Sequence, residues 1–337
     1  MRLVQSWISL PTISSNRTII SNLLLIYLSQ YALNKSDIFT EFYTDEKFAN
    51  LLSGLKFTKI DTDILKGIPT NNKCFAYSKM LVLLNTPLDT VHFDCDILIE
   101  DTNKIKELQD SEWDGTSWNI ETALTKHNSD YFATHTILNM FTDNKYSINE
   151  KKTLNTGFLG FRNQKLKNIF LKQYFHNAEI VNRDWNNMYS CWQKMSDLVL
   201  RSEGEENAHV EYSPTFDLVI EQSNYTQIVE QNNFNVFTFH KEKCVCGSSF
   251  EGIIKHYDVY DASPSSINYN YWNEERVMGI KHYFGGIKYD NSMIQDFYKQ
   301  LKQTPYYNIF INNVINNSDI LLELYNITRD PHLYQFL

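Results

Sequence analysis

The chain has 337 residues, 42% of them hydrophobic, which is enough for one large α/β domain or one domain with a small appendage. Only 11 glycines and 7 prolines occur, so long disordered linkers are not expected. The formal net charge of −9 disfavours a protein that wraps the phosphate backbone of a nucleic acid.

The first half of the chain alternates apolar stretches of strand length and helix length. The expected strands are residues 3–8, 38–44, 57–60 and 90–93. The expected helices are residues 16–33, 46–52, with Asp45 as its N-cap, and 73–84. In the last of these helices, four residues stand at core spacing: Tyr77, Met80, Leu81 and Leu84. This alternation predicts a parallel, doubly wound sheet with helices on both faces.

The pattern loosens beyond residue 97. Extended stretches are expected at residues 97–100, 154–161, 236–239 and 278–283. Helices are expected at residues 102–108, 164–176, 185–201 and 216–231, and in most of the tail from Asn291. We therefore expect a catalytic α/β domain over residues 1–290 and a helical C-terminal extension over residues 291–337 packed on it.

The cysteines and the N-terminus indicate the compartment. Five cysteines form no disulfide framework, so reduced thiols and a cytoplasmic location are expected. The N-terminus has the pattern of a first strand rather than of a signal peptide. The most apolar stretch, residues 19–28, is too short to span a bilayer. No transmembrane segment is expected, which leaves peripheral membrane association open.

Asp94 and Asp96 follow the apolar strand that ends at Phe93. In doubly wound sheets the ligand binds beyond the carboxyl ends of the strands, where this pair stands. Two carboxylates one residue apart reach the same side once the chain leaves the sheet, and they suit Mg²⁺ or Mn²⁺ shared with a diphosphate. Such a metal offsets the charge on a departing nucleotide diphosphate, which is why sugar transfer uses an Asp-x-Asp motif.

A second Asp-x-Asp motif occurs at Asp61-Thr62-Asp63. Lys59 interrupts the apolar run before it, and no supporting motif lies nearby. The sequence therefore favours Asp94 and Asp96 as the metal-binding pair.

Four motifs, taken together, resemble those of GT-A fold glycosyltransferases, and most of all those of family 8. These motifs are Tyr77–Leu81, Asp89–Leu98, Asn155-Thr156-Gly157, and His282-Tyr283-Phe284-Gly285-Gly286-Ile287-Lys288. The last two match the Asn-x-Gly strand and the His-x-x-Gly-x-x-Lys motif of the family. The chain departs from the family pattern where Tyr289-Asp290 replaces the usual Pro-Trp and where Glu221-Gln222 stands in for an Asp-Gln pair. The resemblance implies a divergent member with a mostly parallel mixed sheet flanked by helices.

The resemblance also implies roles for individual residues. The implied metal ligands are Asp94, Asp96 and His282. The implied donor-binding residues are Lys79, Asp94, Asn155, Gly157, Gly285 and Lys288, and Trp7 is a further candidate that stacks on the nucleotide base or belongs to the core. The implied catalytic residues are Asp96, Gln222 and Lys288, the lysine meeting the diphosphate and Gln222 the sugar. Position in the sequence alone leaves other roles open for three of these residues. His282 could be a buried structural histidine, Lys79 a solvated lysine, and Gly285 part of a simple turn.

The resulting hypothesis is a Mn²⁺-dependent enzyme, or a Mg²⁺-dependent one, that transfers a hexose or N-acetylhexosamine from a UDP-linked donor. Resemblance to family 8 implies retention of the anomeric configuration. The acceptor is a hydroxyl of a glycan, a lipid-linked glycan or a protein. Two alternatives stay open, a non-catalytic nucleotide- or glycan-binding module and a nucleotidyltransferase. The second alternative needs a glycine-rich basic loop after the first strand, and residues 9–15 contain none.

Overall fold

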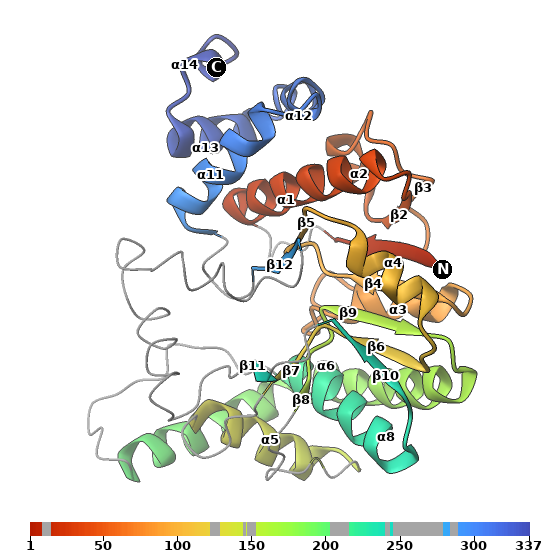
Figure 1. Ribbon diagram of the computed structural model, residues 1–337. Coiled ribbons are helices and arrows are strands. Elements are labelled where there is room, and N and C mark those ends of the chain that lie inside the picture. The colour runs from red at the N-terminus through yellow and green to blue at the C-terminus, as the bar shows by residue number, and fades with distance from the viewer. Residues whose placement is uncertain are drawn as a thin grey trace. The chain divides into compact units, whose positions relative to one another are not determined.

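The computed structural model describes residues 1–8, 15–121, 129–143, 146, 153–202, 216–239, 243–244, 279–283 and 289–337. The chain divides into two compact units, both of which contain strands and helices (Figure 1). The first unit consists of Met1–Asn71, Leu81–Glu112 and Val259–Leu337. The second unit consists of Asn72–Met80 and Trp113–Asp258.

Four parallel strands form the sheet of the first unit, in the order β4-β1-β2-β3. Their bounds are Arg2–Ser6 (β1), Thr40–Tyr43 (β2), Lys59–Asp61 (β3) and Thr90–Phe93 (β4). β1, β2 and β4 are almost completely buried, which is typical of parallel strands covered on both faces. Because the strands are parallel, their carboxyl ends share one edge, where Trp7 follows β1 and Asp94 follows β4.

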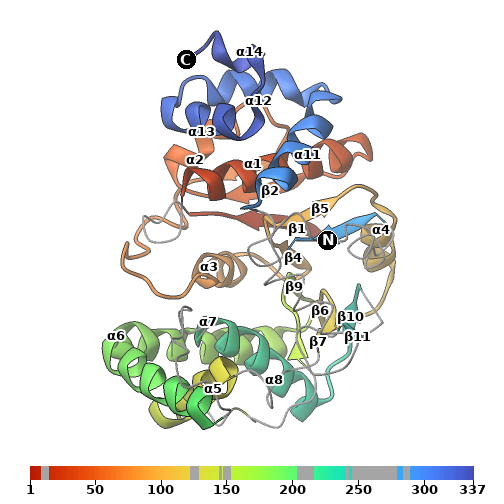
Figure 2. The ribbon, with the colours of Figure 1, turned by 90° about the vertical axis from the view of Figure 1, so that its left-hand side faces the viewer.

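Helix α1, Asn16–Lys35, is the central helix of the hydrophobic core of this unit. Ser15 caps it by accepting a hydrogen bond from the backbone N–H of Thr18 at 3.1 Å. In both views α1 lies between the strands of the unit and the C-terminal helices (Figures 1 and 2). Buried residues, several of them polar, therefore occupy nearly its whole circumference, as in a helix covered on every side.

The C-terminal region is helical, as expected. Its bounds are Asn291–Lys302 (α11), Tyr306–Val314 (α12), Ser318–Thr328 (α13) and Pro331–Tyr334 (α14). Asp290 caps α11 and Asn317 caps α13 through side-chain hydrogen bonds to backbone N–H groups. α11 and α13 pack on α1, and Phe310 of α12 meets the ring of Tyr27 edge-on with centroids 5.2 Å apart. The expected domain boundary after residue 290 stays a prediction.

Three shorter helices complete this part of the chain: Glu46–Leu51 (α2), Tyr77–Asn85 (α3) and Asn103–Asp110 (α4). Asp45 caps α2 as predicted, accepting a hydrogen bond from the N–H of Phe48 at 2.9 Å. The core face predicted for α3 is wrong at its end, because Leu84 is 50% exposed while Val82 and Leu83 are buried. Lys79 is also on the buried side of α3.

The strands of the second unit form two groups. One has the order β10-β6-β9, with bounds Val236–Thr238 (β10), Gly115–Ser117 (β6) and Phe158–Phe161 (β9). The other has the order β11-β7-β8, with bounds Lys243–Cys244 (β11), Ile120–Glu121 (β7) and Thr153–Leu154 (β8). Both combine one parallel and one antiparallel pairing, so the expected mostly parallel mixed sheet flanked by helices is confirmed as a fold class.

The helices of the second unit differ from the expected ones. Their bounds are Ser129–Phe141 (α5), Gln164–Ser202 (α6), Phe216–Leu218 (α7) and Asn224–Asn232 (α8), with the π-helix Val219–Ser223 (η1) between α7 and α8. The separate helices expected at residues 164–176 and 185–201 form one continuous helix, α6. No glycine or proline interrupts residues 177–184, and Ala178, Ile180 and Val181 are buried, so the helix continues.

None of the helices described in either unit contains a stretch both long enough and apolar enough to cross a membrane.

The packing of the C-terminal helices on α1 predicts a large stability effect at Phe310, which is fully buried. Phe310→Ala should lower the free energy of unfolding by about 3–5 kcal/mol, because it leaves a cavity against Tyr27 and Tyr298. Leu322→Ala is the matched control, since Leu322 is 49% exposed, and it should change stability by less than about 0.5 kcal/mol. Urea denaturation measures both, and equal effects would contradict this account of the core.

Candidate metal and donor site

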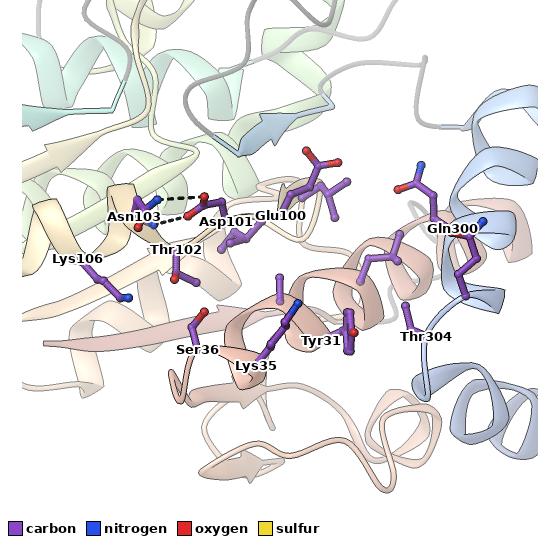
Figure 3. A pocket seen from close by; sticks show the side chains of 15 residues that line it. Tyr31, Lys35, Ser36, Glu100, Asp101, Thr102, Asn103, Lys106, Gln300 and Thr304 are labelled. Atoms are coloured by element: carbon purple, nitrogen blue, oxygen red, sulfur yellow. Dashed lines mark hydrogen bonds between the residues drawn. The ribbon is translucent and has the colours of Figure 1, made fainter.

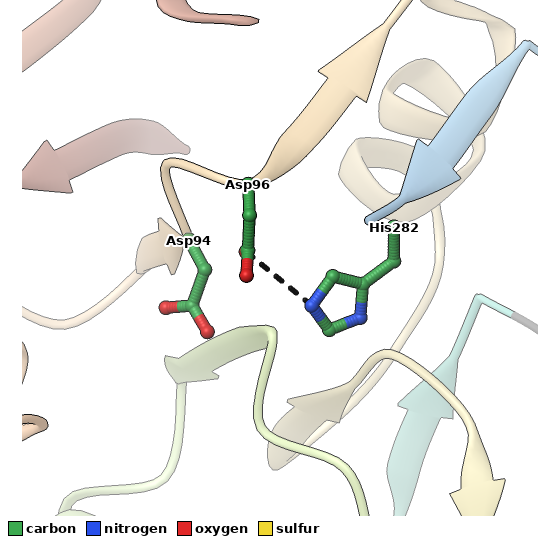
Figure 4. Close-up of side chains that lie close together, drawn as sticks. All are labelled: Asp94, Asp96 and His282. Atoms are coloured by element: carbon green, nitrogen blue, oxygen red, sulfur yellow. Dashed lines mark ion pairs between the residues drawn. The ribbon is translucent and has the colours of Figure 1, made fainter. Parts of the chain in front are cut away.

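Asp94, Asp96 and His282 lie together in the first unit (Figure 4). One potential ligand atom from each side chain lies within 4.8 Å of the other two. Nε2 of His282 is 3.3 Å from Oδ1 of Asp96, and the side chains of His282 and Asp96 are 7% and 14% exposed. Asp94 is 30% exposed, so the group is reachable from solvent on the side of this carboxylate. The three residues predicted as metal ligands are therefore close enough to hold one ion.

The pairing of two short strands brings the histidine to the carboxylates. The chain turns after β4, where the N–H of Ile97 donates to the carbonyl of Asp94 at 3.1 Å, and continues as β5, Ile97–Ile99. Strand β12, Ile280–His282, pairs with β5 in antiparallel register, with His282 opposite Ile97. The N–H of Tyr283 then donates to the carbonyl of Asp96 at 2.9 Å. This register fixes His282 beside Asp96.

Gly279 makes the start of this pairing sterically feasible. Its φ angle is +81°, in the left-handed region that residues with a Cβ rarely adopt. A Cβ at this position would lie 2.2 Å from the Cβ of Asp101. The carbonyl of Gly279 accepts hydrogen bonds from the N–H groups of Glu100 and Asp101, at 2.6 and 3.0 Å. A larger residue would therefore disturb the strand pair that carries His282.

His92 is a site residue that no sequence motif indicates. Its Nδ1 lies 3.6 Å from Oδ1 of Asp94, and its Nε2 lies 2.8 Å from the hydroxyl of Ser6. The side chain is 2% exposed and extends from the middle of β4. A polar residue inside the otherwise apolar Val91-His92-Phe93 run is the signal that was available in the sequence. Partners of this kind hold a ligating side chain in one orientation.

The donor set suits a divalent cation with a preference for oxygen and a tolerance for nitrogen. Carboxylates are preferred by Mg²⁺ and Mn²⁺, whereas imidazole is a rare ligand of Mg²⁺ and an accepted one for manganese and later transition metals. Two carboxylates this close repel each other, and a cation between them would remove that cost. The residues present therefore fit Mn²⁺ better than Mg²⁺.

Lys79 has a different environment from the one expected. Its side chain is 7% exposed and lies in the second unit, where the ammonium is 2.6 Å from Oε1 of Glu221. It also donates to the carbonyl of Thr156 at 3.1 Å, and the hydroxyl of Thr156 donates to Glu221 at 2.6 Å. The ammonium is thus part of a buried ion pair and not a solvated surface charge. Such a pair fixes α3 against the segment that carries Glu221.

Asp217 adds a second buried carboxyl one helical turn before Glu221. It accepts hydrogen bonds from the N–H of Ala76 at 2.6 Å and from the hydroxyl of Tyr174 at 2.7 Å. Burial raises the pKa of Asp217 to about 7, aided by the charge of Glu221 and opposed by these hydrogen bonds and by Lys79. The cluster therefore has two carboxyls for one lysine, and part of the population of Asp217 is protonated at neutral pH.

Gln222 lies in the π-helix η1 and is 5% exposed. Its Oε1 has no hydrogen-bond partner among the residues that the structure describes. The helix is expected to run regularly from Phe216, and the single π-helical turn is a departure that the apolar periodicity does not predict. Short π-helical insertions are frequent at functional sites, so Gln222 keeps its place as a candidate.

Asn155 and Gly157 form a turn between β8 and β9. The single strand expected over residues 154–161 is therefore wrong. The carboxamide oxygen of Asn155 accepts a hydrogen bond from the N–H of Gly157 at 2.8 Å, which closes the turn. The carbonyl of Asn155 accepts from Trp118 N–H and from the hydroxyl of Ser117, each at 2.8 Å. The motif is thus firmly held within the second unit.

Trp7 follows β1 in the first unit and packs on the ring of Phe48, with centroids 5.7 Å apart. Its side chain is partly buried against the hydrophobic core of that unit. Both of the interpretations offered for Trp7 remain compatible with this position. Gly285 and Lys288 lie outside the described residues.

The decoy motif has structural roles. Oδ1 of Asp61 accepts hydrogen bonds from the N–H groups of Asp63 and Ile64, and Oδ2 is 2.6 Å from the ammonium of Lys59. Although burial opposes the shift, these partners lower the pKa of Asp61 below its usual value. Asp63 is paired with Lys66 at 2.8 Å. The motif closes a turn and neutralises two lysines.

No known protein family and no curated protein matches the chain by sequence. Among solved structures, galactosyltransferase LgtC with donor and acceptor sugar analogues is 13% identical, with a TM-score of 0.36 over 90% of this chain and 98% of LgtC. Glycosyltransferase GlyE of Streptococcus pneumoniae TIGR4 is 9% identical, with a TM-score of 0.38 over 94% of this chain and 64% of GlyE. Mouse xyloside xylosyltransferase 1 is 11% identical, with a TM-score of 0.33 over 84% of this chain and 96% of that protein. TM-scores this low support no conclusion about the function of this chain.

The buried carboxyl of Asp217 predicts how stability changes with pH. The pKa of an aspartate in the unfolded chain is about 3.9, whereas the pKa of Asp217 in the folded protein is about 7. The stability that this group contributes is complete below the unfolded value and is lost as the pH rises through the folded one. Relative to Asp217→Asn, the parent should lose up to about 1.4 kcal/mol of unfolding free energy per pH unit over this range.

Urea denaturation at a series of pH values measures this difference in slope. Asp296→Asn is the control, because Asp296 is exposed and should leave the slope unchanged. Parallel curves for the parent and for Asp217→Asn would show that the pKa of this carboxyl is the same in the folded and unfolded chains.

Proposed function

We propose that the chain is a metal-dependent glycosyltransferase of GT-A type that uses a nucleotide diphosphate sugar. The observation that carries the proposal is the group of Asp94, Asp96 and His282, whose ligand atoms lie within 4.8 Å of one another. The group follows the carboxyl end of β4, the edge at which parallel sheets bind their ligands. Membership of family 8 stays a prediction, supported by the order of the four sequence motifs.

The residues of the site have separate tasks in this proposal. Asp94, Asp96 and His282 would hold Mn²⁺, which, when bound, would offset the charge of the donor diphosphate. His92, held by Ser6, would keep the carboxylate of Asp94 in its ligating orientation. Preorganised charges of this kind stabilise the departing diphosphate without reorganisation during the reaction.

The remaining predicted residues would bind the donor. Lys288 and Gly285 follow His282 closely in the sequence, which supports contact with the phosphates. Gln222 is buried with its carbonyl oxygen unpartnered among the described residues, which supports contact with the sugar. Asn155 and Gly157 would support the donor through their turn, and Trp7 would stack on the base. UDP as the nucleotide, retention of configuration and a glycan, lipid-linked glycan or protein acceptor follow from the resemblance alone, and a cytoplasmic location follows from the cysteine usage.

Lys79 calls for a revised role in the proposal. Its ammonium is bound to Glu221 and Thr156, so we propose that it supports the donor site by fixing η1, which carries Gln222. The ion pair with Glu221 also favours a second candidate function, a non-catalytic nucleotide- or glycan-binding module. In such a module Lys79 has only a structural role, because its ammonium is bound to Glu221 and does not contact the donor phosphates. Slow hydrolysis of the donor separates the two, since a binding module would retain the nucleotide sugar unchanged.

The metal-binding pair is tested by comparing it with the decoy. In the presence of Mn²⁺, Asp96→Asn should lower the release of UDP from UDP-sugars by about 10²-fold or more, because one metal-bound charge is lost. Asp63→Asn is the matched control, since Asp63 is exposed and pairs only with Lys66 among the described residues. Its activity should stay within a few-fold of the parent. Excess chelator should abolish turnover, and full activity in chelator would exclude the metal-dependent mechanism.

The role of Lys288 is tested by steady-state kinetics. Charge accumulates on the leaving phosphate as the bond to the sugar breaks, so Lys288→Ala should lower kcat by roughly 10²-fold and change KM much less. Lys288→Arg should restore only part of the activity, because a planar guanidinium does not occupy the space of an ammonium. Lys299→Ala, which removes an exposed lysine of α11, is the control. A Lys288→Ala enzyme with parental kcat would show that the lysine has no part in the reaction.

A further inference from the structure

A cavity of about 590 Å³ lies in the first unit, and none of the candidate metal ligands lines it (Figure 3). It is lined by the second half of α1, by the chain that leaves β5 and enters α4, and by the end of α11. Strand β5 connects the two places, because Asp96 precedes it and part of the cavity wall, from Leu98 to Asp101, belongs to it or follows it. Small-molecule sites are typically about 300–1,000 Å³, so the cavity has the size of a ligand site.

One side of the cavity carries two lysines, Lys35 at the end of α1 and Lys106 in α4. Neither forms an ion pair with another described residue, whereas the neighbouring Lys104 is bound to Glu107 and Lys281 to Glu100. The pairing with Lys281 also compensates Glu100, an acidic residue of the cavity wall. Lys35 and Lys106 are exposed lysines without an ion-pair partner among the described residues, and the wall also carries the carboxylates of Asp101 and of Glu100, which is paired with Lys281.

The first turn of α4 adds hydrogen-bond donors on the same side. Asp101 accepts from the backbone N–H and the carboxamide of Asn103, at 2.7 and 3.1 Å, so its oxygens are already engaged. The next two N–H groups, of Lys104 and Ile105, have no acceptor within the helix. Thr102 occupies the N-cap position but makes no side-chain capping bond. The carboxylate of Asp101 thus occupies the first N–H of α4, and only the N–H groups of Lys104 and Ile105 remain for an added anion.

Thr102 supplies an independent indication of a ligand. The residue is 3% exposed and lines the cavity, and its hydroxyl, which forms no hydrogen bond with another described residue, is open to the cavity. Figure 3 shows this hydroxyl in the space between Lys106 and Ser36. A hydroxyl that faces an open cavity from an otherwise buried residue is available to a molecule bound there.

The other side of the cavity is neutral. Gln300 and Gln303, at the end of α11, extend carboxamides that form no hydrogen bond with another described residue, and Tyr31 contributes an aromatic ring. In Figure 3 Gln300 and Thr304 lie on the side opposite Lys106 and Thr102, with Tyr31 and Lys35 between. Carboxamides both donate and accept, which suits vicinal hydroxyls, and an aromatic ring suits the C–H face of a sugar.

We propose that this cavity binds a phosphorylated sugar, with the phosphomonoester at the start of α4 and the sugar ring beside Tyr31 and Gln300. Lys35, Lys106 and the hydroxyl of Thr102 meet the phosphate oxygens. The site is separate from the group of Asp94, Asp96 and His282, so it requires neither a metal nor the transfer reaction. Its failure and the failure of the proposed glycosyltransferase activity are therefore distinguishable.

Isothermal titration calorimetry in excess chelator tests the proposal with three probes: glucose 6-phosphate, inorganic phosphate and glucose. Glucose 6-phosphate should bind at least about 10-fold more tightly than either of the others, because only this probe reaches both sides of the cavity. Inorganic phosphate binding as tightly would refute the sugar half of the site. Glucose binding as tightly would refute the anion half, and no binding of glucose 6-phosphate would refute both.

Matched variants locate the binding. Lys106→Gln and Thr102→Val should each weaken glucose 6-phosphate by about 5-fold or more, since each removes one contact to the phosphate. Gln300→Ala should weaken glucose 6-phosphate but leave inorganic phosphate unchanged. Lys172→Gln is the control, because it removes an exposed lysine of α6 in the second unit. Equal losses in Lys172→Gln and Lys106→Gln would reduce the effect to general electrostatics and overturn the assignment.

Thr102→Val also distinguishes a ligand from a structural role. The hydroxyl makes no capping bond, so the variant should unfold at the parental urea concentration. A loss of stability in this variant, together with unchanged binding of glucose 6-phosphate, would show that Thr102 serves the helix and would sink the proposal.

Discussion

The antiparallel pairing of β12 with β5 is the interaction on which the candidate metal site depends. Asp94 and Asp96 are neighbours in the sequence, but His282 joins them only because its strand pairs with β5 in one register. A slip of one residue would move the imidazole to the other face of the strand pair. Gly279 protects this register, since only a residue without a Cβ tolerates its backbone angle and its approach to Asp101. A three-residue strand thus determines the chemistry of the site.

The fold and the site were predictable where local signals sufficed. β4 ends at Phe93 as the apolar run indicates, Asp45 caps α2, and the helical tail begins close to Asn291. Asp94 and Asp96 were candidates because they follow a strand end, whereas His282 was a candidate only because its motif resembles that of family 8. Contacts between residues far apart in the sequence determine the features that were not predicted. The burial of Lys79 follows from Glu221, the π-helical turn at Gln222 follows from tertiary packing, and His92 has a role only beside Ser6. No local pattern encodes such partners.

The buried cluster of Lys79, Glu221 and Asp217 illustrates how charge is accommodated inside the second unit. Taking an ammonium and two carboxyls out of water is costly, and one ion pair compensates only one of the carboxyls. The second carboxyl, that of Asp217, accepts hydrogen bonds from a backbone N–H and from the hydroxyl of Tyr174. Burial raises its pKa, so it is not fully charged at neutral pH. Such an arrangement specifies one packing of α3 against η1, because any other packing would leave a buried charge without a partner.

The order of the ligands along the chain has a consequence for how the protein is made. Asp94 and Asp96 leave the ribosome long before His282, and Tyr283, which follows the histidine, packs on Phe297 of α11 with ring centroids 5.0 Å apart. The strand that carries the third ligand therefore gains this support only after α11 has been synthesised. Vectorial folding thus passes through an early state with two carboxylates and no imidazole, which ends when α11 is available to pack on α1.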